Sequence, residues 1–337
     1  MLFVITYSIV NLDVDNIKTI KIGVIGVGHL GNFHISKLKE IPKISISGIF
    51  DIDKKRSNEI SDIYKVNCFS SIDEIVNGSD AISIVTPTST HYDIANMALD
   101  AGCHIFVEKP ITNNICHANE LLIKAANLKK IIQVGHIERF NPAFSVLKNM
   151  DLNPTFIESH RLSEFNPRGN DVPVILDLMI HDLDIILSLV NSKIKNIQAN
   201  GVKVISKSVD IANARIEFEN GCVANVTASR ISQKNMRKMR IFQNKEYLTI
   251  DYKNKSLEQF KIINNVADLD KDAKLYNLDG YKYILHNTPI IEQYDALYKE
   301  LAHFIDSIRT FSQPQSSGES ATKALELSLL IQKIIDE

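Results

Sequence analysis

From residue 20 to about residue 135, short apolar runs alternate with stretches whose hydrophobic positions have helical spacing. The apolar runs cover residues 20–25, 44–50, 80–85, 104–107 and 131–135. Stretches such as residues 90–101 separate them and place apolar side chains on one helical face. Repeated strand–helix units predict a parallel, doubly wound α/β sheet, because each parallel strand needs a long crossover connection.

The pattern changes after about Gly135. Residues 214–230 contain two alternating strands on either side of an Asn-Gly pair at 220–221, which is typical of a tight hairpin turn. Residues 239–252 indicate a second hairpin. We therefore expect an α+β domain with an open, mainly antiparallel sheet, one face of which covers a ligand site.

Four further segments lie outside these two patterns. Residues 264–280 read as a mobile polar insertion, and residues 296–311 and 320–336 predict two amphipathic helices that pack back on the first domain. Residues 1–19 read as an N-terminal extension outside the fold. Their apolar stretch is too short to span a bilayer, and it lacks the basic start and the cleavage site of a signal peptide.

A glycine-rich turn, GVGHLG at residues 26–31, joins the first predicted strand to its helix. In this GxGxxG spacing, the first glycine permits a tight turn, the second lets the backbone approach a pyrophosphate, and the third lets helix and strand pack closely. The helix N-terminus then presents unpaired N–H groups to phosphate. The candidate cofactor-binding residues in this turn are Gly26, Gly28, His29, Leu30 and Gly31, with the His29 side chain a bystander.

The second predicted strand ends in Asp51, 20 residues after Gly31. An acidic side chain at this point accepts hydrogen bonds from the adenine ribose and repels a 2′-phosphate. Asp51 therefore favours NAD over NADP as the cofactor. The alternative, a solvated loop acid, is disfavoured by the spacing, and Asp53 is interpreted as a bystander.

Polar residues also follow the next two strands of the predicted sheet. The carboxyl ends of parallel strands meet at one edge, where open α/β sheets bind their ligands. The candidates for cofactor contacts at this edge are Thr86, Pro87, His91, Glu108 and Lys109. For His91 a helix-capping role is as well supported as a ligand contact. The proline after Lys109 pushes that lysine out of the helical region and permits a cis bond.

Residues 174–190 have the periodicity of a helix that carries polar side chains among apolar ones. Asp177 and His181 are four residues apart, so they share a face with about 5–6 Å between their Cβ atoms. Asp184 continues that face, whereas Asp182 points elsewhere. A carboxylate beside an imidazole orients it and supports its protonated form, as a general base requires. The alternative is an ordinary helical pair without a catalytic role.

The amino-acid composition argues against several classes of function. The 337 residues are 45% hydrophobic and 23% charged, with a formal net charge of −2, which gives no electrostatic case for nucleic acid or an anionic membrane. The four cysteines show no CxxC spacing, so neither a zinc site nor a disulfide framework is indicated, and no metal is expected. Scattered reduced thiols fit the cytoplasm.

The glycine-rich turn, residues 86–110 and the stretch DLMIHDLD at residues 177–184 together resemble the Gfo/Idh/MocA oxidoreductases, over nearly the whole chain from about residue 20. The resemblance implies an NAD-binding Rossmann domain, a substrate and oligomerisation domain, and C-terminal helices. The corresponding bounds are 20–138, 139–290 and 291–337. It also implies that Lys109, from the EKP motif, and Asp177 and His181, from the D-x-x-x-H motif, carry the chemistry and contact the substrate.

A closer similarity, to the branch of UDP-N-acetylglucosamine 3-dehydrogenases, is found in residues 134–143, 158–190 and 209–232. This branch oxidises the C3 hydroxyl of the sugar before a transaminase installs an amine, and in Gram-negative bacteria the product can feed lipid A. The resemblance therefore implies a nucleotide-sugar substrate.

Basic residues cluster by sequence in the second domain, and arginine suits a diphosphate because it forms bidentate charge-assisted hydrogen bonds. The cluster comprises Arg139, Arg161, Arg168, Arg230, Arg237 and Arg240. We select the first four as substrate-contact candidates, with the stronger case for Arg161, Arg168 and Arg230. The alternative is that most are solvated strand residues.

These features predict an NAD-dependent dehydrogenase. Lys109 would bind the reacting hydroxyl, His181 would accept its proton and Asp177 would orient the imidazole. The rival interpretations are a dehydrogenase of another sugar, a cyclitol or a UDP-sugar acid, and a non-catalytic NAD-sensing regulator of the same fold. We also expect a homo-oligomer, a dimer or tetramer, formed through the sheet of the second domain.

Overall fold

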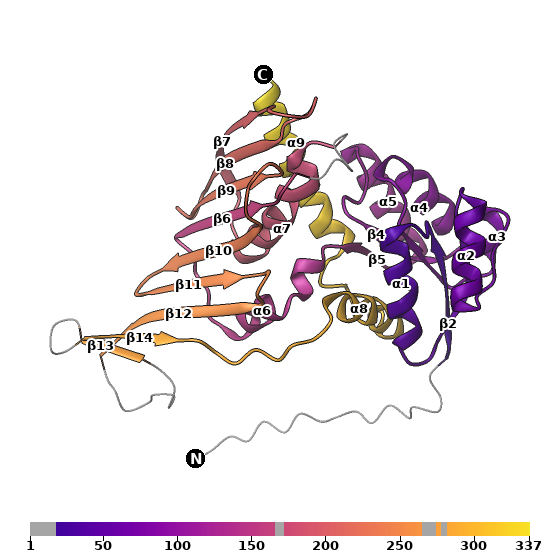
Figure 1. Cartoon of the computed structure of the whole chain (residues 1–337), viewed down its shortest axis with the longest axis horizontal. Helices are drawn as coiled ribbons and strands as arrows, with labels where there is room; N and C mark the ends of the chain where they lie inside the picture. Colours follow the sequence, from indigo (N-terminus) through magenta and orange to yellow (C-terminus); the bar gives the residue numbers. More distant parts are fainter. Residues whose placement is uncertain (1–17, 166–171, 265–273, 278–281) are drawn as a thin grey trace, which may run out of the picture.

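The computed structural model describes residues 18–165, 172–264, 274–277 and 282–337. Five parallel strands form the first sheet, in the order β2-β1-β3-β4-β5 (Figure 1). The strands are β1 (Ile20–Ile25), β2 (Ile44–Phe50), β3 (Ala81–Ile84), β4 (His104–Glu108) and β5 (Ile132–Gly135). The predicted doubly wound sheet is therefore confirmed.

Helices cover both faces of this sheet, which explains why its central strands are apolar without alternation. The helices of the first domain are α1 (His29–Glu40), α2 (Lys54–Tyr64), α3 (Ile72–Asn77), α4 (His91–Asp100) and α5 (Ile115–Leu128), with a short 3₁₀ turn, η2 (Thr88–Thr90), before α4. On one face Ile22 and Phe106 pack against Phe304 of helix α8 (Ala296–Thr310). On the other face Ile82 packs with Leu325 of helix α9 (Gly318–Asp336).

The second sheet has nine strands among the described residues, in the order β13-β14-β12-β11-β10-β6-β9-β8-β7. They are β6 (Phe156–Leu162), β7 (Ile194–Val202), β8 (Ile211–Phe218), β9 (Val223–Ser229), β10 (Met236–Gln243), β11 (Glu246–Asp251), β12 (Ser256–Ile263), β13 (Lys274–Asn277) and β14 (Tyr283–Asn287). Only the pairing of β6 with β9 is parallel among them, so the predicted mainly antiparallel sheet is confirmed. Gly221 has a φ of +86° in the turn between β8 and β9, which supports the predicted hairpin.

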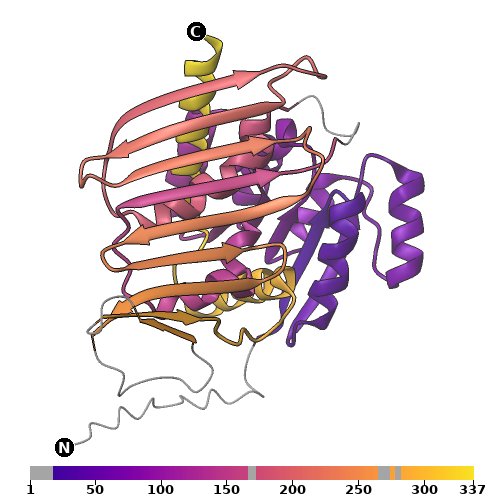
Figure 2. The same ribbon diagram turned by 60° about the vertical axis from the view of Figure 1, so that its left-hand side comes forward.

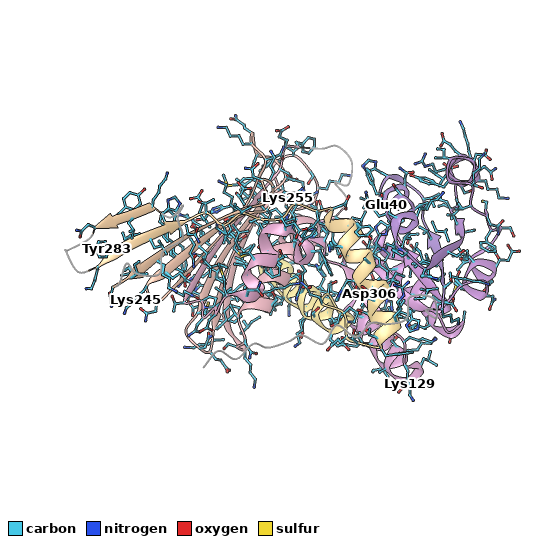
Figure 3. All side chains as sticks on the ribbon, turned by 90° about the horizontal axis from the view of Figure 1, so that it is seen from below. Glu40, Lys129, Lys245, Lys255, Tyr283 and Asp306 are labelled. Carbon is cyan, nitrogen blue, oxygen red and sulfur yellow. The ribbon has the colours of Figure 1, made fainter. Side chains whose placement is uncertain are left out.

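Helices cover one face of the large sheet and leave the other open (Figure 2). The covering helices include α7 (Ile180–Leu189) and α9, with the π-helical turn η5 (Ile175–Met179) before α7. Helix α9 also contacts α5, and α8 contacts α1, so both C-terminal helices lie between the sheets. Figure 3 shows this layer, with Asp306 of α8 labelled in it. The segment η3 (Ile137–Phe140), α6 (Pro142–Ser145) and η4 (Val146–Asn149) links the domains.

Several predictions concern residues outside the described ranges: the N-terminal extension up to residue 17, Arg168, and residues 265–273 and 278–280 of the polar insertion. Within that insertion, residues 274–277 form strand β13 and pair with β14, so the expectation of a mobile segment is wrong for those four residues. In the part of the chain that the structure describes, no helix is long and apolar enough to cross a membrane.

Candidate active site between the two sheets

The three glycines of the turn after β1 occupy their positions for different structural reasons. Gly26 has a φ of +87°, and a Cβ there would lie 2.5 Å from the carbonyl oxygen of Val85. A Cβ on Gly31 would lie 1.9 Å from the carbonyl oxygen of Gly26. A Cβ on Gly28, by contrast, would meet nothing within 4 Å. Gly26 and Gly31 are thus fixed by packing, whereas Gly28, the N-cap of α1, leaves space where a pyrophosphate would approach the helix.

Asp51 lies directly beside this turn. Its Oδ2 accepts a hydrogen bond from the backbone N–H of Val27 at 2.7 Å, and its Oδ1 accepts one from Asp53 N–H at 2.9 Å. Asp53 itself caps α2, as its bystander role requires. Arg56, which the sequence did not single out, donates from Nε to the Val27 carbonyl at 3.0 Å. The carboxylate predicted to meet the ribose is therefore held beside the phosphate turn, with a guanidinium next to it.

His91 joins the ends of two strands. Its Nε2 lies 2.9 Å from the carbonyl oxygen of Thr86, and its Nδ1 lies 2.9 Å from that of Pro110. The ring is buried, and burial lowers the pKa of His91 below its ordinary value. Both ring nitrogens face protein carbonyls, which favours the structural alternative over a polar contact with a ligand. The peptide bond between Lys109 and Pro110 is cis.

Glu108 points into the first domain rather than toward a ligand. Its Oε1 lies 3.2 Å from Nε2 of His34, whose Nδ1 lies 3.0 Å from Oγ of Ser83. A Cβ on Gly135 would lie 2.8 Å from the Glu108 carboxylate, so a glycine at that position makes room for it. Burial would raise the pKa of Glu108, but His34 and the charge of Lys109 outweigh it and lower that pKa. The prediction of a cofactor contact is corrected for this side chain, whose Oε2 accepts a hydrogen bond from the backbone N–H of Lys109 at 3.3 Å.

The ammonium group of Lys109 crosses from the first domain to the second. Its Nζ donates to the backbone carbonyl oxygen of Asp177 at 2.6 Å and lies 3.2 Å from Oδ1 of the same residue. The side chains are 19% and 42% exposed, so the pair opens to solvent on the side of Asp177. We expected Asp177 to orient His181. In the structure its hydrogen-bond and ion-pair partner is Lys109 instead.

The backbone around Asp177 explains this exchange of partners. We expected residues 174–190 to form one α-helix, but Ile175–Met179 adopts a π-helical turn before α7 begins at Ile180. A π-turn holds more residues than an α-turn, so the four-residue spacing no longer aligns Asp177 with His181. Such local irregularities are frequent at functional sites. Here the carbonyl of Asp177 is available to Lys109.

His181 is partly buried in an electropositive environment. Its Nδ1 is buried and has no hydrogen-bond partner among the described residues. The ring of His136 is edge-on to it, 6.2 Å away between centroids. Burial, together with the positive charges of Lys109 and Arg161, holds the pKa of His181 well below its ordinary value. We expected support for the imidazolium form, but the environment favours neutral imidazole, which can accept a proton.

Arg161 is the centre of a buried ion network beneath His181. The side chain is on β6, and its Nε donates to Oδ2 of Asp182 at 2.6 Å while Nη1 donates to Oε1 of Glu138 at 2.9 Å. Only 3% of the residue is exposed. Its partners outweigh burial and raise the pKa of Arg161 further above its ordinary range. Arg161 therefore fails as a substrate-contact candidate, because internal carboxylates bind its guanidinium.

Arg139 and Arg230 are also internal. Arg139 makes two hydrogen bonds to the carboxylate of Asp184, at 2.6 and 2.7 Å. Arg230 is 5% exposed and donates to the carbonyl oxygen of Val172. Asp184 does not lie open beside Asp177, because it is buried against Arg139. The substrate-contact prediction is thus corrected for both arginines on grounds of burial.

Arg237 is the cation that sequence reasoning named but did not select. In the register of β6 and β10 it lies directly opposite Arg161, so both side chains are on the helix-covered face. The Arg237 side chain is 55% exposed, and its Nη1 lies 3.7 Å from Oε1 of Glu138. Its charge also contributes to the lowered pKa of His181. Only the strand register reveals that Arg237 reaches this site.

The described residues include no group of three or more His, Cys, Asp and Glu side chains that could hold a metal ion. The four cysteines are free thiols, and two of them, Cys103 and Cys222, are buried. The groups at the site are thus a fixed ammonium, a neutral imidazole, a half-exposed guanidinium and the dinucleotide turn. Such a set can bind a polar substrate and remove a hydroxyl proton beside a cofactor.

Two protein-family models match the chain. A model described as an oxidoreductase family with an NAD-binding Rossmann fold matches residues 20–136. The GFO/IDH/MocA C-terminal domain matches residues 133–249.

Known proteins give the same assignment. The chain is 34% identical over 315 residues to UDP-N-acetylglucosamine 3-dehydrogenase of Acidithiobacillus ferrooxidans, which covers 93% of this chain and 96% of that protein. A solved structure of that enzyme superposes with a TM-score of 0.85 at 33% identity, covering 94% of this chain and 98% of the other. Myo-inositol 2-dehydrogenase of Thermotoga maritima is 23% identical, covering 94% of this chain and 96% of that enzyme.

Proposed function

The chain belongs to the Gfo/Idh/MocA oxidoreductase family, and we propose that within it the protein oxidises the C3 hydroxyl of UDP-N-acetylglucosamine, with NAD as the cofactor. It is a dehydrogenase of alcohol groups that uses a nicotinamide cofactor. The observation that carries the proposal is the convergence of Lys109 and His181, from different domains, at the carboxyl edge of the parallel sheet, the edge at which the dinucleotide turn also lies.

The residues of the chain divide the chemical work between them. Lys109, held by Asp177, presents a fixed positive charge that binds the reacting hydroxyl and stabilises negative charge as its proton leaves. Neutral His181 accepts that proton on its ring. The bound nicotinamide supplies the hydride acceptor.

The cofactor proposal is specific for NAD. The space at Gly28 and the N-terminus of α1 fit a pyrophosphate, and the carboxylate of Asp51 fits the ribose beside them. A 2′-phosphate placed there would meet the negative charge of Asp51, although Arg56 lies close enough to reduce that repulsion.

The nucleotide-sugar proposal rests on the relative that is 34% identical over almost the whole of both chains. We propose that Arg237 contacts the anionic part of this substrate, because it is the exposed cation on the active-site face of β10. Arg168 stays a candidate outside the described residues. We place the reaction in the cytoplasm, before an amine-forming transaminase, in a route that supplies lipid A precursors.

A second candidate substrate is a free cyclitol, because inositol dehydrogenases are also related to this chain. The deciding experiment incubates purified protein with NAD and separately with UDP-N-acetylglucosamine, N-acetylglucosamine, myo-inositol and the 6-carboxylated UDP-sugar, following NADH absorbance. We expect the highest kcat/KM with UDP-N-acetylglucosamine. Equal efficiency with free N-acetylglucosamine or inositol would reject the nucleotide-sugar proposal.

We also propose that a second copy of the chain covers the open face of the large sheet. Cross-strand neighbours place aromatic rings in one row over five strands, with adjacent centroids between 4.2 and 5.6 Å apart. The row comprises Phe156, Phe242, Tyr247, Phe260 and His286.

Both signs of charge flank this row, in the pairs Arg240–Glu158 and Lys238–Asp251. A patch with both signs is complementary to itself across a two-fold axis. Light scattering should give a dimer or larger species for the wild type and a smaller species for Phe260→Asp. A monomeric wild type would reject the proposal.

A further inference from the structure

A second cavity, separate from the candidate active site, lies between helix α8 and the segment that links the domains. Its volume is about 530 Å³, within the range of small-molecule sites. The lining includes two lysines, one histidine and two tyrosines: Lys148, Lys299, His303, Tyr294 and Tyr298. A neighbouring cavity of about 630 Å³ shares Lys148 with it. Neither cavity includes Lys109, Asp177 or His181 in its lining.

Positive charge in this cavity exceeds the negative charge that could balance it. Within the described ranges, no carboxylate lies at ion-pair distance from Lys148 or Lys299. Lys148 instead donates to Oε1 of Gln315 at 2.5 Å. Asp306 lines the cavity, but its side chain is 67% exposed and pairs with Arg309 at 3.4 Å.

Exclusion of solvent and neighbouring charge both act on the titratable side chains of this cavity. Partial burial and then the charge of Arg139 lower the pKa of Lys148. Burial and then the charge of Lys148 lower the pKa of His303. Lys148 therefore lies near another positive charge, with no carboxylate of the described residues at ion-pair distance, and an anion bound beside it would be attracted electrostatically.

The cavity also has features that fit the organic part of a ligand. Tyr294 and Tyr298 supply aromatic surface, and Nζ of Lys299 lies 5.5 Å from the centre of the Tyr294 ring. The N–H of Gln315 donates to Nε2 of His303 at 2.9 Å. Because Nε2 is an acceptor there, the neutral ring carries its proton on Nδ1 and retains a donor.

We propose that this cavity binds a phosphorylated small molecule, with its phosphate among Lys148, Lys299 and His303 and its organic part against the two tyrosines. The combination of ammonium groups, an imidazole donor and aromatic surface matches a nucleotide or a similar phosphate ester. The inference does not depend on the dehydrogenase reaction.

Arg139 gives this site a structural connection to the candidate active site. Its guanidinium lines the cavity and holds Asp184, whose carboxylate lies 3.9 Å from Nδ1 of His136. The carbonyl oxygen of Arg139 accepts from Nε2 of Gln315 at 2.8 Å, and Gln315 also binds Lys148. A ligand on Lys148 is thus connected to His136, the neighbour of His181, through Gln315, Arg139 and Asp184 in turn.

Isothermal titration of the full chain, saturated with NAD, tests the proposal with inorganic phosphate, uridine monophosphate and uridine. We expect the two phosphate-bearing probes to bind and uridine to bind at least tenfold more weakly than its monophosphate. Tighter binding of the nucleotide than of phosphate would support contact of the organic part with the two tyrosines, and equal binding would overturn that part of the proposal.

Variants locate the binding. The double variant Lys148→Gln/Lys299→Gln should weaken both phosphate-bearing probes at least tenfold, whereas Lys333→Gln, which removes one lysine charge from an exposed part of α9, should leave them unchanged. Arg237→Gln reports binding at the candidate active site. Unchanged affinity in the double variant, or loss of binding only in Arg237→Gln, would overturn the proposal. Thermal unfolding of each variant checks that it remains folded.

Discussion

The ammonium nitrogen of Lys109 lies 2.6 Å from the backbone carbonyl oxygen of Asp177, a residue 68 positions later in the chain and in the other domain. The contact fixes a cation at the carboxyl end of β4 and holds the π-helical turn η5 against the first domain. Because one acceptor is a backbone carbonyl, the contact survives loss of the Asp177 carboxylate. This hydrogen bond gives the Lys109 ammonium group a defined position before any substrate binds.

We predict that Lys109→Ala lowers kcat by about 10²-fold or more, the usual scale for a positioned acid–base or charge-stabilising group. NAD binding should persist, because the dinucleotide turn is untouched. Asp177→Asn is the matched control, and it should lose less activity because the backbone acceptor remains. Steady-state kinetics and NAD titration measure both. Equal losses in the two variants would show that the backbone acceptor alone does not keep the ammonium in its active position.

His181 should determine the acid limb of the pH profile of kcat/KM. The pKa of His181 is lowered by burial and by its charged neighbours Lys109, Arg161, His136 and Arg237. The imidazole therefore stays neutral at pH values below about 6.5, the ordinary pKa of histidine. Activity should therefore fall only as the pH drops below that value. His181→Ala should lower kcat by about 10²-fold and remove this limb. A limb above pH 7 in the wild type would exclude His181 as the group observed.

Asp51→Ala should weaken NAD binding several-fold and reduce discrimination against NADP. The substitution removes both a ribose acceptor and a negative charge that repels a 2′-phosphate, while Arg56 stays in place. Dissociation constants for both cofactors, measured by fluorescence titration, test this. Asp62→Ala, an exposed acid on α2, is the control. A wild-type preference for NADP would contradict the role given to Asp51.

Arg237→Ala should raise the KM for UDP-N-acetylglucosamine several-fold and leave kcat nearly unchanged. A contact remote from the reacting carbon contributes equally to the ground state and the transition state. The effect should shrink at high ionic strength, because the side chain is 55% exposed and its charge is screened. Arg240→Ala, on the opposite face of the same strand, is the control. A fall in kcat without a change in KM would exclude a simple binding role.

Glu300→Gln should stabilise the protein at high pH. Glu300 is fully buried on α8, and neither of its carboxyl oxygens has a hydrogen-bond partner among the described residues. Burial raises the pKa of Glu300 well above its ordinary value, and the negative charges of Glu108, Asp184 and Glu138 raise it further. A raised folded-state pKa means that its stabilising effect is complete below the unfolded value of about 4.3 and is lost as the pH rises through the folded value.

Glutamine keeps the neutral form at every pH, so its benefit should grow from pH 5 to pH 8. Because the glutamine cannot ionise, the free energy of unfolding should rise relative to the wild type more at pH 8 than at pH 5. Urea unfolding at the two pH values measures the difference. Glu326→Gln, an exposed acid on α9, should show no such trend. A destabilised Glu300→Gln at pH 8 would mean that the carboxylate has a partner in solution.

Local sequence patterns were sufficient to predict the fold class and the principal chemical groups. Local spacing was sufficient, because alternation of strands and helices implies a parallel sheet, and glycines at fixed intervals imply the turn that Gly26 and Gly31 make. The position of Lys109 at a strand end followed from the same periodicity. These features depend on residues that are close together in the chain.

Tertiary structure decided how the polar groups pair. The spacing of Asp177 and His181 suggested one helical face, but the π-turn and the approach of Lys109 from another domain gave Asp177 a different partner. Likewise Arg161 and Arg237 are both basic strand residues. Arg161 is buried and paired with carboxylates from distant elements, whereas the side chain of Arg237 remains 55% exposed. Burial and charge pairing depend on which segments pack over a side chain, and local sequence does not contain that information.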